Sequence, residues 1–119
     1  MDKDKVKVFH IEESEWVDIE EGIKRRTVAL GRNMMLNMYR NEKGSVIPQH
    51  NHPQELMAVL LEGEVEVTFN EKKYQLKPGM GYHIPPGVMH GPFVTTSEKP
   101  ALYLDILSPP REQEEYAKK

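Results

Sequence analysis

The chain has 119 residues, and its 16 lysines and arginines against 19 aspartates and glutamates give a formal net charge of −3. This length predicts a single domain over residues 1–119, and a slightly acidic chain without a basic stripe argues against nucleic acid as a partner. The absence of cysteine excludes a disulfide framework, a thiolate metal site and a cysteine nucleophile. The charged start, Met1–Lys5, and the shortness of the longest aliphatic run, Leu56–Leu61, predict no secretory signal and no membrane span, and therefore a cytoplasmic protein.

The first third of the chain predicts short strands separated by turns. Glycine and proline lie between short apolar runs, which is the pattern of an all-β chain. Val6–Phe9, Arg25–Leu30 and Asn33–Tyr39 are predicted strands. The acidic stretch Glu12–Glu21 between them is predicted to turn over the surface.

The rest of the chain continues this pattern more sharply. Leu56–Leu61 is a continuous apolar run, which predicts a strand buried on both faces. Further strands are predicted at Val65–Phe69, Tyr74–Leu76 and Ala101–Leu107, with turns at Asn70–Lys73, Pro78–Gly79 and Pro85–Gly87. Eight or more short strands imply a sandwich or barrel, whose core we place at about residues 23–108. Glu112–Lys119 is predicted to form a short helical C-terminal tail.

Histidine is the informative residue type. His50 and His52 are separated by one residue, so an extended backbone places both imidazoles on one face with their Cα atoms about 6–7 Å apart. Two imidazoles at that spacing can converge on one metal ion about 2 Å from each nitrogen. Taken alone, the pair fits a surface loop equally well.

Two spaced motifs surround these histidines. The first is Gly44-x5-His50-x-His52 followed after ten residues by Gly63, and the second is Gly79-x5-Pro85-x-Gly87-x2-His90, with 15 residues between the motifs. Together they resemble the two motifs of the cupin superfamily, a double-stranded β-helix or jelly-roll barrel. The resemblance implies that His50, His52 and His90 bind a divalent metal. Neutral imidazoles suit zinc, nickel, iron, manganese or copper, and the sequence does not choose among them.

The fourth ligand of the family pattern is missing. Its usual glutamate or glutamine position is occupied here by Leu56, which cannot ligate. Three alternatives remain: three histidines with water in the open positions, Gln54 or Glu55 turned inward by a β-bulge, or a site that binds metal weakly or not at all. We favour the first.

A closer resemblance is carried by the segments His50–Glu55, Leu60–Gly63, Gly81–Gly91 and Leu104–Arg111. They are similar to small pectin-degradation proteins that open the ring of unsaturated uronates. The resemblance implies an anionic sugar substrate, an isomerisation without organic cofactor, and functional roles for Asp105 and Arg111. The family's aromatic residue between these two is replaced by Leu107, and its ligand glutamine by Leu56.

Asp105 and Arg111 stand out without the family as well. Asp105 interrupts an otherwise apolar strand, where a carboxylate is costly unless it is paired or ligated. A structural salt bridge and a general acid or base facing the cavity both fit this pattern. The guanidinium of Arg111 matches a uronate carboxylate in a two-pronged geometry, although a solvated surface arginine remains the alternative.

These residues support three candidate functions. The first is a metal-binding enzyme that opens the ring of a 4,5-unsaturated uronate to a linear keto acid, with Asp105 and Arg111 as catalytic residues. The second is a three-histidine metal-dependent dioxygenase, and the third is a non-catalytic binder of sugars or small ligands, which Leu56 and Leu107 favour. Small cupins usually pair through sheet edges or an exchanged N-terminal strand, so the resemblance, together with the candidate strand Val6–Phe9, implies a homodimer.

Overall fold

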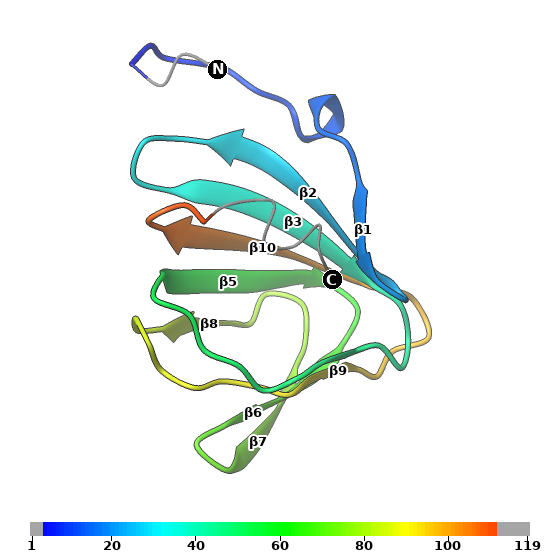
Figure 1. The fold of residues 1–119 in the computed structure, drawn as a ribbon. Coiled ribbons are helices and arrows are strands. Elements are labelled where there is room, and N and C mark those ends of the chain that lie inside the picture. Colours follow the sequence, from blue (N-terminus) through cyan, green and yellow to red (C-terminus); the bar gives the residue numbers. More distant parts are fainter. Residues whose placement is uncertain (1–3, 112–119) are drawn as a thin grey trace.

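The computed structural model describes residues 4–111, which form two antiparallel sheets packed face to face (Figure 1). The six-stranded sheet has the order β1-β2-β3-β10-β5-β8, and the four-stranded sheet has the order β4-β9-β6-β7. The elements are η1 (Ile11–Glu13), β1 (Val17–Glu20), β2 (Ile23–Leu30), β3 (Met35–Asn41), β4 (Val46–Ile47), β5 (Glu55–Glu62), β6 (Val65–Phe69), β7 (Lys72–Leu76), β8 (Gly81–Ile84), β9 (Phe93–Thr95) and β10 (Ala101–Ser108). The predicted all-β jelly-roll fold is confirmed.

The last strand lies in the middle of the larger sheet. β10 pairs antiparallel with β3 on one side and with β5 on the other. This register places Asp105 opposite Asn37 of β3 and opposite Ala58 of β5. A residue near the end of the chain is thereby fixed at the centre of the barrel wall.

Most predicted strands are present with small shifts at their ends. Val65–Phe69 agrees at both ends, and the predicted Arg25–Leu30 corresponds to β2, which begins two residues earlier, at Ile23. The predicted surface turn over Glu12–Glu21 is wrong in part, since the range contains the last two residues of η1 and the whole edge strand β1. Among the residues that the structure describes, no helix is long and apolar enough to cross a membrane.

Two strand predictions need correction. Val6–Phe9 forms no strand and belongs to neither sheet. Leu56–Leu61 does form a strand, but only its inner face is buried by this chain. The inner residues Leu56, Ala58 and Leu60 are 6%, 9% and 3% exposed, whereas the outer residues Met57, Val59 and Leu61 are 57%, 36% and 43% exposed. The predicted helical tail, Glu112–Lys119, lies outside the described residues.

The core fills the space between the two sheets. It combines inward-facing aliphatic residues with the rings of Tyr39, Tyr103 and Phe93. Alternate residues of each strand reach this core because side chains in a strand point to opposite faces in turn. The same alternation places polar residues such as Asn37 and Asp105, which are almost fully buried, inside the barrel.

Gly63 directly follows β5, lies against the first residue of β10 and allows the chain to turn into β6 of the other sheet. Its φ is +82°, and a Cβ atom added there would lie 2.7 Å from the Cα of Ala101. Gly79 has a similar φ of +93° but no atom within 4 Å of an added Cβ. A side chain at Gly79 would therefore cause backbone strain alone, whereas one at Gly63 would cause both strain and a steric clash.

We predict that Gly79→Ala lowers the free energy of unfolding by about 1 kcal/mol, the cost of a left-handed backbone for a residue with a Cβ. Gly63→Ala should lower it by about 2–4 kcal/mol, because overpacking against the β10 backbone adds to that strain. Urea unfolding of both variants measures the difference. Equal losses would contradict the steric role of Gly63.

Candidate metal centre

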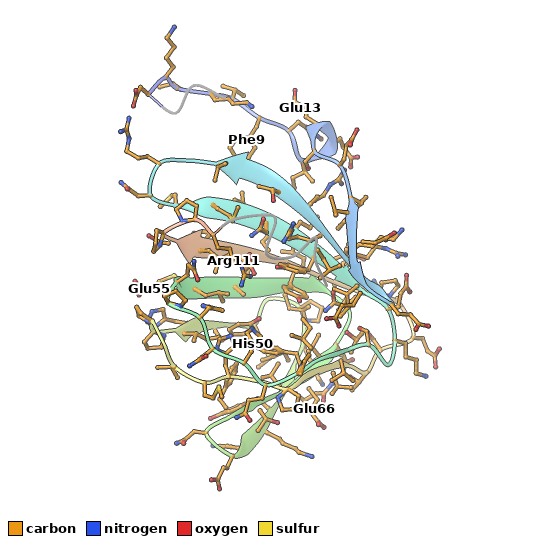
Figure 2. All side chains as sticks on the ribbon, in the orientation of Figure 1. Phe9, Glu13, His50, Glu55, Glu66 and Arg111 are labelled. Carbon is orange, nitrogen blue, oxygen red and sulfur yellow. The ribbon has the colours of Figure 1, made fainter. Side chains whose placement is uncertain are left out.

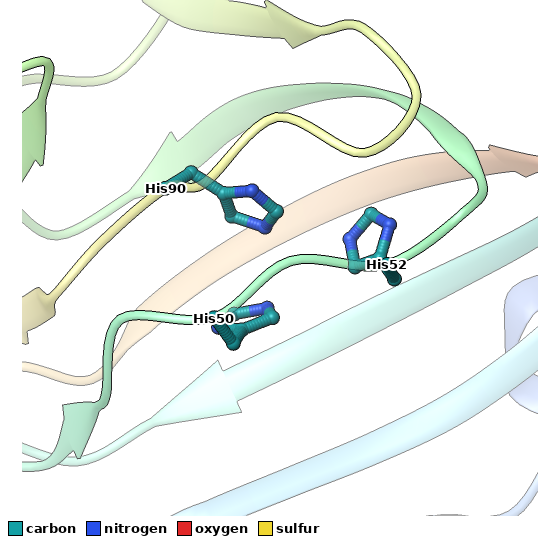
Figure 3. A group of neighbouring side chains, drawn as sticks. All are labelled: His50, His52 and His90. Atoms are coloured by element: carbon teal, nitrogen blue, oxygen red, sulfur yellow. The ribbon is translucent and has the colours of Figure 1, made fainter.

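Three histidines meet at one end of the barrel interior (Figure 3). His50 and His90 lie on neighbouring segments that pair through two backbone hydrogen bonds, each with an N–O distance of 2.9 Å. His52 follows two residues after His50 at the entry to β5, and the backbone N–H of Gly87 donates to its carbonyl oxygen at 2.9 Å. Backbone pairing thus brings the two sequence motifs together and aims their rings at one point.

The spacing of the three rings suits a single ion. One ligand nitrogen from each histidine lies within 4.8 Å of the others, and the ring centroids are 4.3–5.6 Å apart. Nitrogens bound to one ion at about 2 Å lie about 3–4 Å apart. Small side-chain rotations would therefore close the cluster on an ion.

Each ring is held by a hydrogen bond on its Nδ1 atom. His50 Nδ1 bonds the carbonyl oxygen of Pro48 at 2.8 Å, His52 Nδ1 that of Gln54 at 3.0 Å, and His90 Nδ1 that of Val88 at 2.8 Å. Carbonyl oxygens only accept, so Nδ1 carries the proton in all three rings, and in the neutral form of each ring Nε2 presents its lone pair. A ring whose second nitrogen is held in this way by a backbone carbonyl is typical of metal-binding histidines.

Burial favours the neutral form of two of these rings. It lowers the pKa of His90 to about 4, and it lowers the pKa of His52 from its ordinary value. The positive charge of Arg111 lowers both pKa values further. His52 Nε2 is buried without a hydrogen-bond partner in the described structure. Neutral rings with an unused, buried lone pair fit a divalent metal.

The fourth-ligand candidates lie in different places. Leu56 is buried and lines the cavity at the histidine cluster. Gln54 is 8% exposed, and its Oε1 atom is buried without a hydrogen-bond partner in the described structure. Glu55 is exposed on the outer side of β5, where its carboxylate bonds His83 Nε2 at 2.6 Å. The structure thus brings His50, His52 and His90 together and leaves Glu55 outside the cluster.

The cluster opens into a cavity of about 140 Å³ between the two sheets. Asp105 and Arg111 line the same cavity as the three histidines. All five side chains that the sequence singles out as functional therefore face one space. The lining residues are Ile19, Glu20, Ile23, Tyr39, Ile47, Pro48, His50, His52, Leu56, Tyr82, Ile84, His90, Phe93, Tyr103, Asp105 and Arg111.

Asp105 is 5% exposed, and its Oδ1 atom has no hydrogen-bond partner in the described structure. Burial raises the pKa of this carboxyl to about 7, although the positive charges of Arg111 and Arg25 and the amide of Asn37 act in the opposite direction. Desolvation disfavours the charged carboxylate more than these groups favour it. Asp105 can therefore both take up and release a proton near neutral pH.

Three tyrosines form much of the cavity wall. The rings of Tyr39 and Tyr103 stack with centroids 5.1 Å apart, and the Asn41 amide donates to the Tyr103 hydroxyl at 3.1 Å. Burial raises the pKa of Tyr39, Tyr82 and Tyr103 far above the ordinary value. These side chains remain neutral hydroxyls at physiological pH and can donate hydrogen bonds to a ligand.

The sequence analysis missed Arg25. This side chain is 3% exposed and hydrogen-bonds Tyr39, and its charge lowers the pKa of Asp105. Its neighbour Arg26 instead packs with its guanidinium carbon 4.6 Å from the Trp16 ring centroid. Two adjacent arginines in a strand must point to opposite faces. This alternation is the sequence signal that could have predicted an arginine side chain, Arg25 or Arg26, inside the barrel.

Comparison with known proteins identifies the class. The cupin domain model matches residues 37–107, and the chain therefore belongs to the cupin family. It is 29% identical to the pectin degradation protein KdgF of Dickeya dadantii over 104 residues, which span 87% of this chain and 93% of that protein.

Two solved structures agree with this relationship. KdgF from a Halomonas species superposes with a TM-score of 0.82 at 28% identity, covering 92% of this chain and 99% of that one. An RmlC-like cupin from Shewanella frigidimarina gives a TM-score of 0.77 at 27% identity, covering 87% and 90%. The chain is thus a cupin related to KdgF, with a three-histidine cluster that can hold a metal.

We predict that Asp105 makes the stability of the metal-free protein pH-dependent. Its pKa is raised on folding, so its contribution is fully present below about pH 4 and is lost as the pH rises through about 7. The loss amounts to about 4 kcal/mol at most. Asp105→Asn should abolish this decline, as measured by urea unfolding from pH 4.5 to 8 with a chelator present.

Asp18→Asn serves as the matched control, because Asp18 is an exposed aspartate on β1. Its free energy of unfolding should follow the same pH dependence as that of the wild type. The histidines contribute equally in the wild type and in both variants, so they do not affect the comparison. Parallel curves for wild type and Asp105→Asn would contradict the raised pKa of Asp105.

Proposed function

We propose that this cupin is an isomerase that opens the ring of a 4,5-unsaturated uronate to a linear keto acid. The observation that carries the proposal is Asp105, a buried carboxyl with a pKa of about 7 in the same cavity as the three-histidine cluster. A general acid or base works best when its pKa lies near the operating pH. Similarity to the KdgF pectin degradation proteins supports the choice of substrate class.

Substrate binding is assigned to Arg111 and the tyrosine wall. Arg111 lines the cavity, and its guanidinium can hold the uronate carboxylate through two parallel hydrogen bonds. Tyr39 and Tyr82 also line the cavity, and a tyrosine hydroxyl can donate to a sugar oxygen.

The reaction moves one proton within the substrate. Asp105 as the carboxylate accepts the proton of the anomeric hydroxyl, and the bond between the anomeric carbon and the ring oxygen breaks. The anomeric carbon becomes a carbonyl, and the ring oxygen with the former alkene becomes an enolate. Asp105 returns the proton to the enolate carbon, which leaves a ketone, so that atoms and electrons balance without an oxidant.

Arg111 has a second part in this scheme. Its positive charge next to the conjugated carboxylate stabilises the negative charge that develops on the enolate. His50, His52 and His90 would hold a divalent ion, which would supply Lewis-acid polarisation of a substrate oxygen. The neutral rings and the buried, unpartnered Nε2 of His52 are the features of this chain that fit such an ion.

Leu56 favours a second candidate function. It places an apolar side chain in the cavity at the position of the family's amide or acidic ligand. A cavity with fewer metal-ligating side chains and a more apolar wall fits a protein that binds the same anionic sugar without catalysing a reaction. Both candidates use Arg111 for recognition, but only the isomerase needs the proton transfer by Asp105.

The proposal predicts that the wild-type protein accelerates loss of the alkene absorbance of freshly generated unsaturated galacturonate. Asp105→Asn should lower kcat at least about 100-fold, since it removes the proton shuttle. Arg111→Lys should mainly raise KM, since it loses the two-pronged contact. Alkene absorbance and oxygen consumption are measured together with each added metal.

Glu55→Gln is the control, because Glu55 faces away from the cavity, and it should retain wild-type kinetics. Thermal stabilisation by the sugar without turnover would instead establish the binder. Iron-dependent oxygen uptake would establish the dioxygenase. Full activity of Asp105→Asn would remove the proton-transfer role assigned here.

A further inference from the structure

A row of polar side chains crosses the inner face of the six-stranded sheet beside Asp105. Thr27 of β2 is the cross-strand partner of Asn37 in β3, and Asn37 is the partner of Asp105 in β10. Directly opposed residues of antiparallel strands point to the same face, with their Cβ atoms about 4.5–5.5 Å apart. Asn37 is 0% exposed and Asp105 is 5% exposed. Three adjacent strands thus bring a hydroxyl, an amide and a carboxyl into one line inside the barrel.

The first link of this row is a hydrogen bond from Thr27 to Asn37. The Thr27 hydroxyl donates to Asn37 Oδ1 with an Oγ1–Oδ1 distance of 2.9 Å. Because the oxygen and the nitrogen of an amide lie on opposite sides of the group, this bond turns Nδ2 toward β10. The reverse orientation would aim Oδ1 at the carboxylate of Asp105, and two buried acceptors that face each other repel. The hydroxyl of Thr27 therefore stabilises the orientation in which the amide presents donors to Asp105.

The second link joins Asn37 to Asp105. Asn37 Nδ2 and Asp105 Oδ1 are both buried, and neither atom makes a hydrogen bond of ordinary geometry in the described structure. The Asn37 amide nevertheless acts on the carboxyl of Asp105 as a donor and lowers its pKa. Leaving a buried donor and a buried acceptor unpaired is costly. Since the two residues are direct cross-strand partners, small side-chain rotations can close this bond.

We propose that Thr27 and Asn37 are positioning residues for the reaction assigned to Asp105. Thr27 holds the Asn37 amide with its N–H groups toward β10, and the amide orients the carboxylate of Asp105 and favours its charged form. This inference rests on the proposed function of Asp105 as an acid and base. A base that starts as a buried carboxylate gains from such a donor, because a hydrogen bond to the charged form offsets part of the desolvation cost.

Other ionisable groups also face Asp105. Arg25 of β2 and Arg111 after β10 lower its pKa by their positive charge, whereas its partner in β5, Ala58, carries no ionisable group. Arg111 lies toward the middle of the molecule, as does His50 of the histidine cluster that lines the same cavity (Figure 2). The charge of Asp105 helps to raise the pKa of three tyrosines, Tyr39, Tyr82 and Tyr103. Removing the amide or the hydroxyl changes none of these groups, so the effect of such a change reports on the row itself.

Carbon-13 NMR titration of the Asp105 carboxyl in the metal-free protein tests the inference without substrate. Leucine has nearly the shape of asparagine but no donor, so Asn37→Leu should raise the titration midpoint by about one pH unit or more, the size of one hydrogen bond to a charged group. Thr27→Val should also raise the midpoint, whereas Thr27→Ser keeps the hydroxyl and should restore the wild-type value. The resonance is identified by its loss in Asp105→Asn, and circular dichroism melts check that each variant is folded.

Thr95→Val is the matched control, because Thr95 is a buried threonine on β9 of the other sheet. It should leave the titration midpoint of Asp105 unchanged. A wild-type midpoint in either Asn37→Leu or Thr27→Val would overturn the proposal, even if the wild type is an active isomerase. A shift of equal size in Thr95→Val would overturn it as well, since the effect would then not be specific to the row.

Turnover of unsaturated galacturonate separates this inference from the proposed function. In an active wild type, the acidic limb of the kcat–pH profile should move to higher pH in Asn37→Leu by the same amount as the titration midpoint. KM should change less than kcat, because neither Thr27 nor Asn37 lines the cavity. An acidic limb that stays in place would overturn the positioning role. A wild type without turnover would overturn the proposed function, and shifted midpoints would then still support the action of the amide on Asp105.

Discussion

The convergence of three imidazoles in the cavity between the two sheets is the constraint on which the site depends. His50 and His90 come from motifs far apart in the sequence, and two backbone hydrogen bonds hold their segments side by side. A carbonyl oxygen on each Nδ1 then fixes the orientation of every ring. These carbonyls belong to the backbone of the jelly roll, and no other side chain is needed to orient the rings. The backbone itself therefore preorganises the cluster.

The second constraint is the cost of burying Asp105. A carboxyl in a nearly closed core is held partly protonated by desolvation, and the cations of Arg25 and Arg111 keep its pKa from rising further. This balance lowers stability at neutral pH and at the same time creates a group that exchanges protons there. Stability and reactivity are thus coupled at one residue, which lies in the same cavity as the histidine cluster.

Local patterns in the sequence predict most of the strands, because alternation and turn residues act over a few positions. The resemblance of the two spaced motifs to those of cupins also predicts that His50, His52 and His90 share one site, and the structure brings them together. The inward direction of Arg25 and the pairing of Asp105 with Asn37 depend on strand register, which no local pattern determines. The uncovered outer face of β5 likewise depends on what the chain packs against, and not on the chain alone.

X-ray absorption of the protein loaded with Zn²⁺ tests the central claim most directly. Three converging histidines predict a first shell with three imidazole nitrogens at about 2.0–2.1 Å, completed by oxygen. Replacing His90 by alanine should remove one imidazole and weaken binding, whereas His83→Ala, on the outer side of β8, should change neither. A shell with one imidazole or none, or a wild type that binds no ion, would contradict the account.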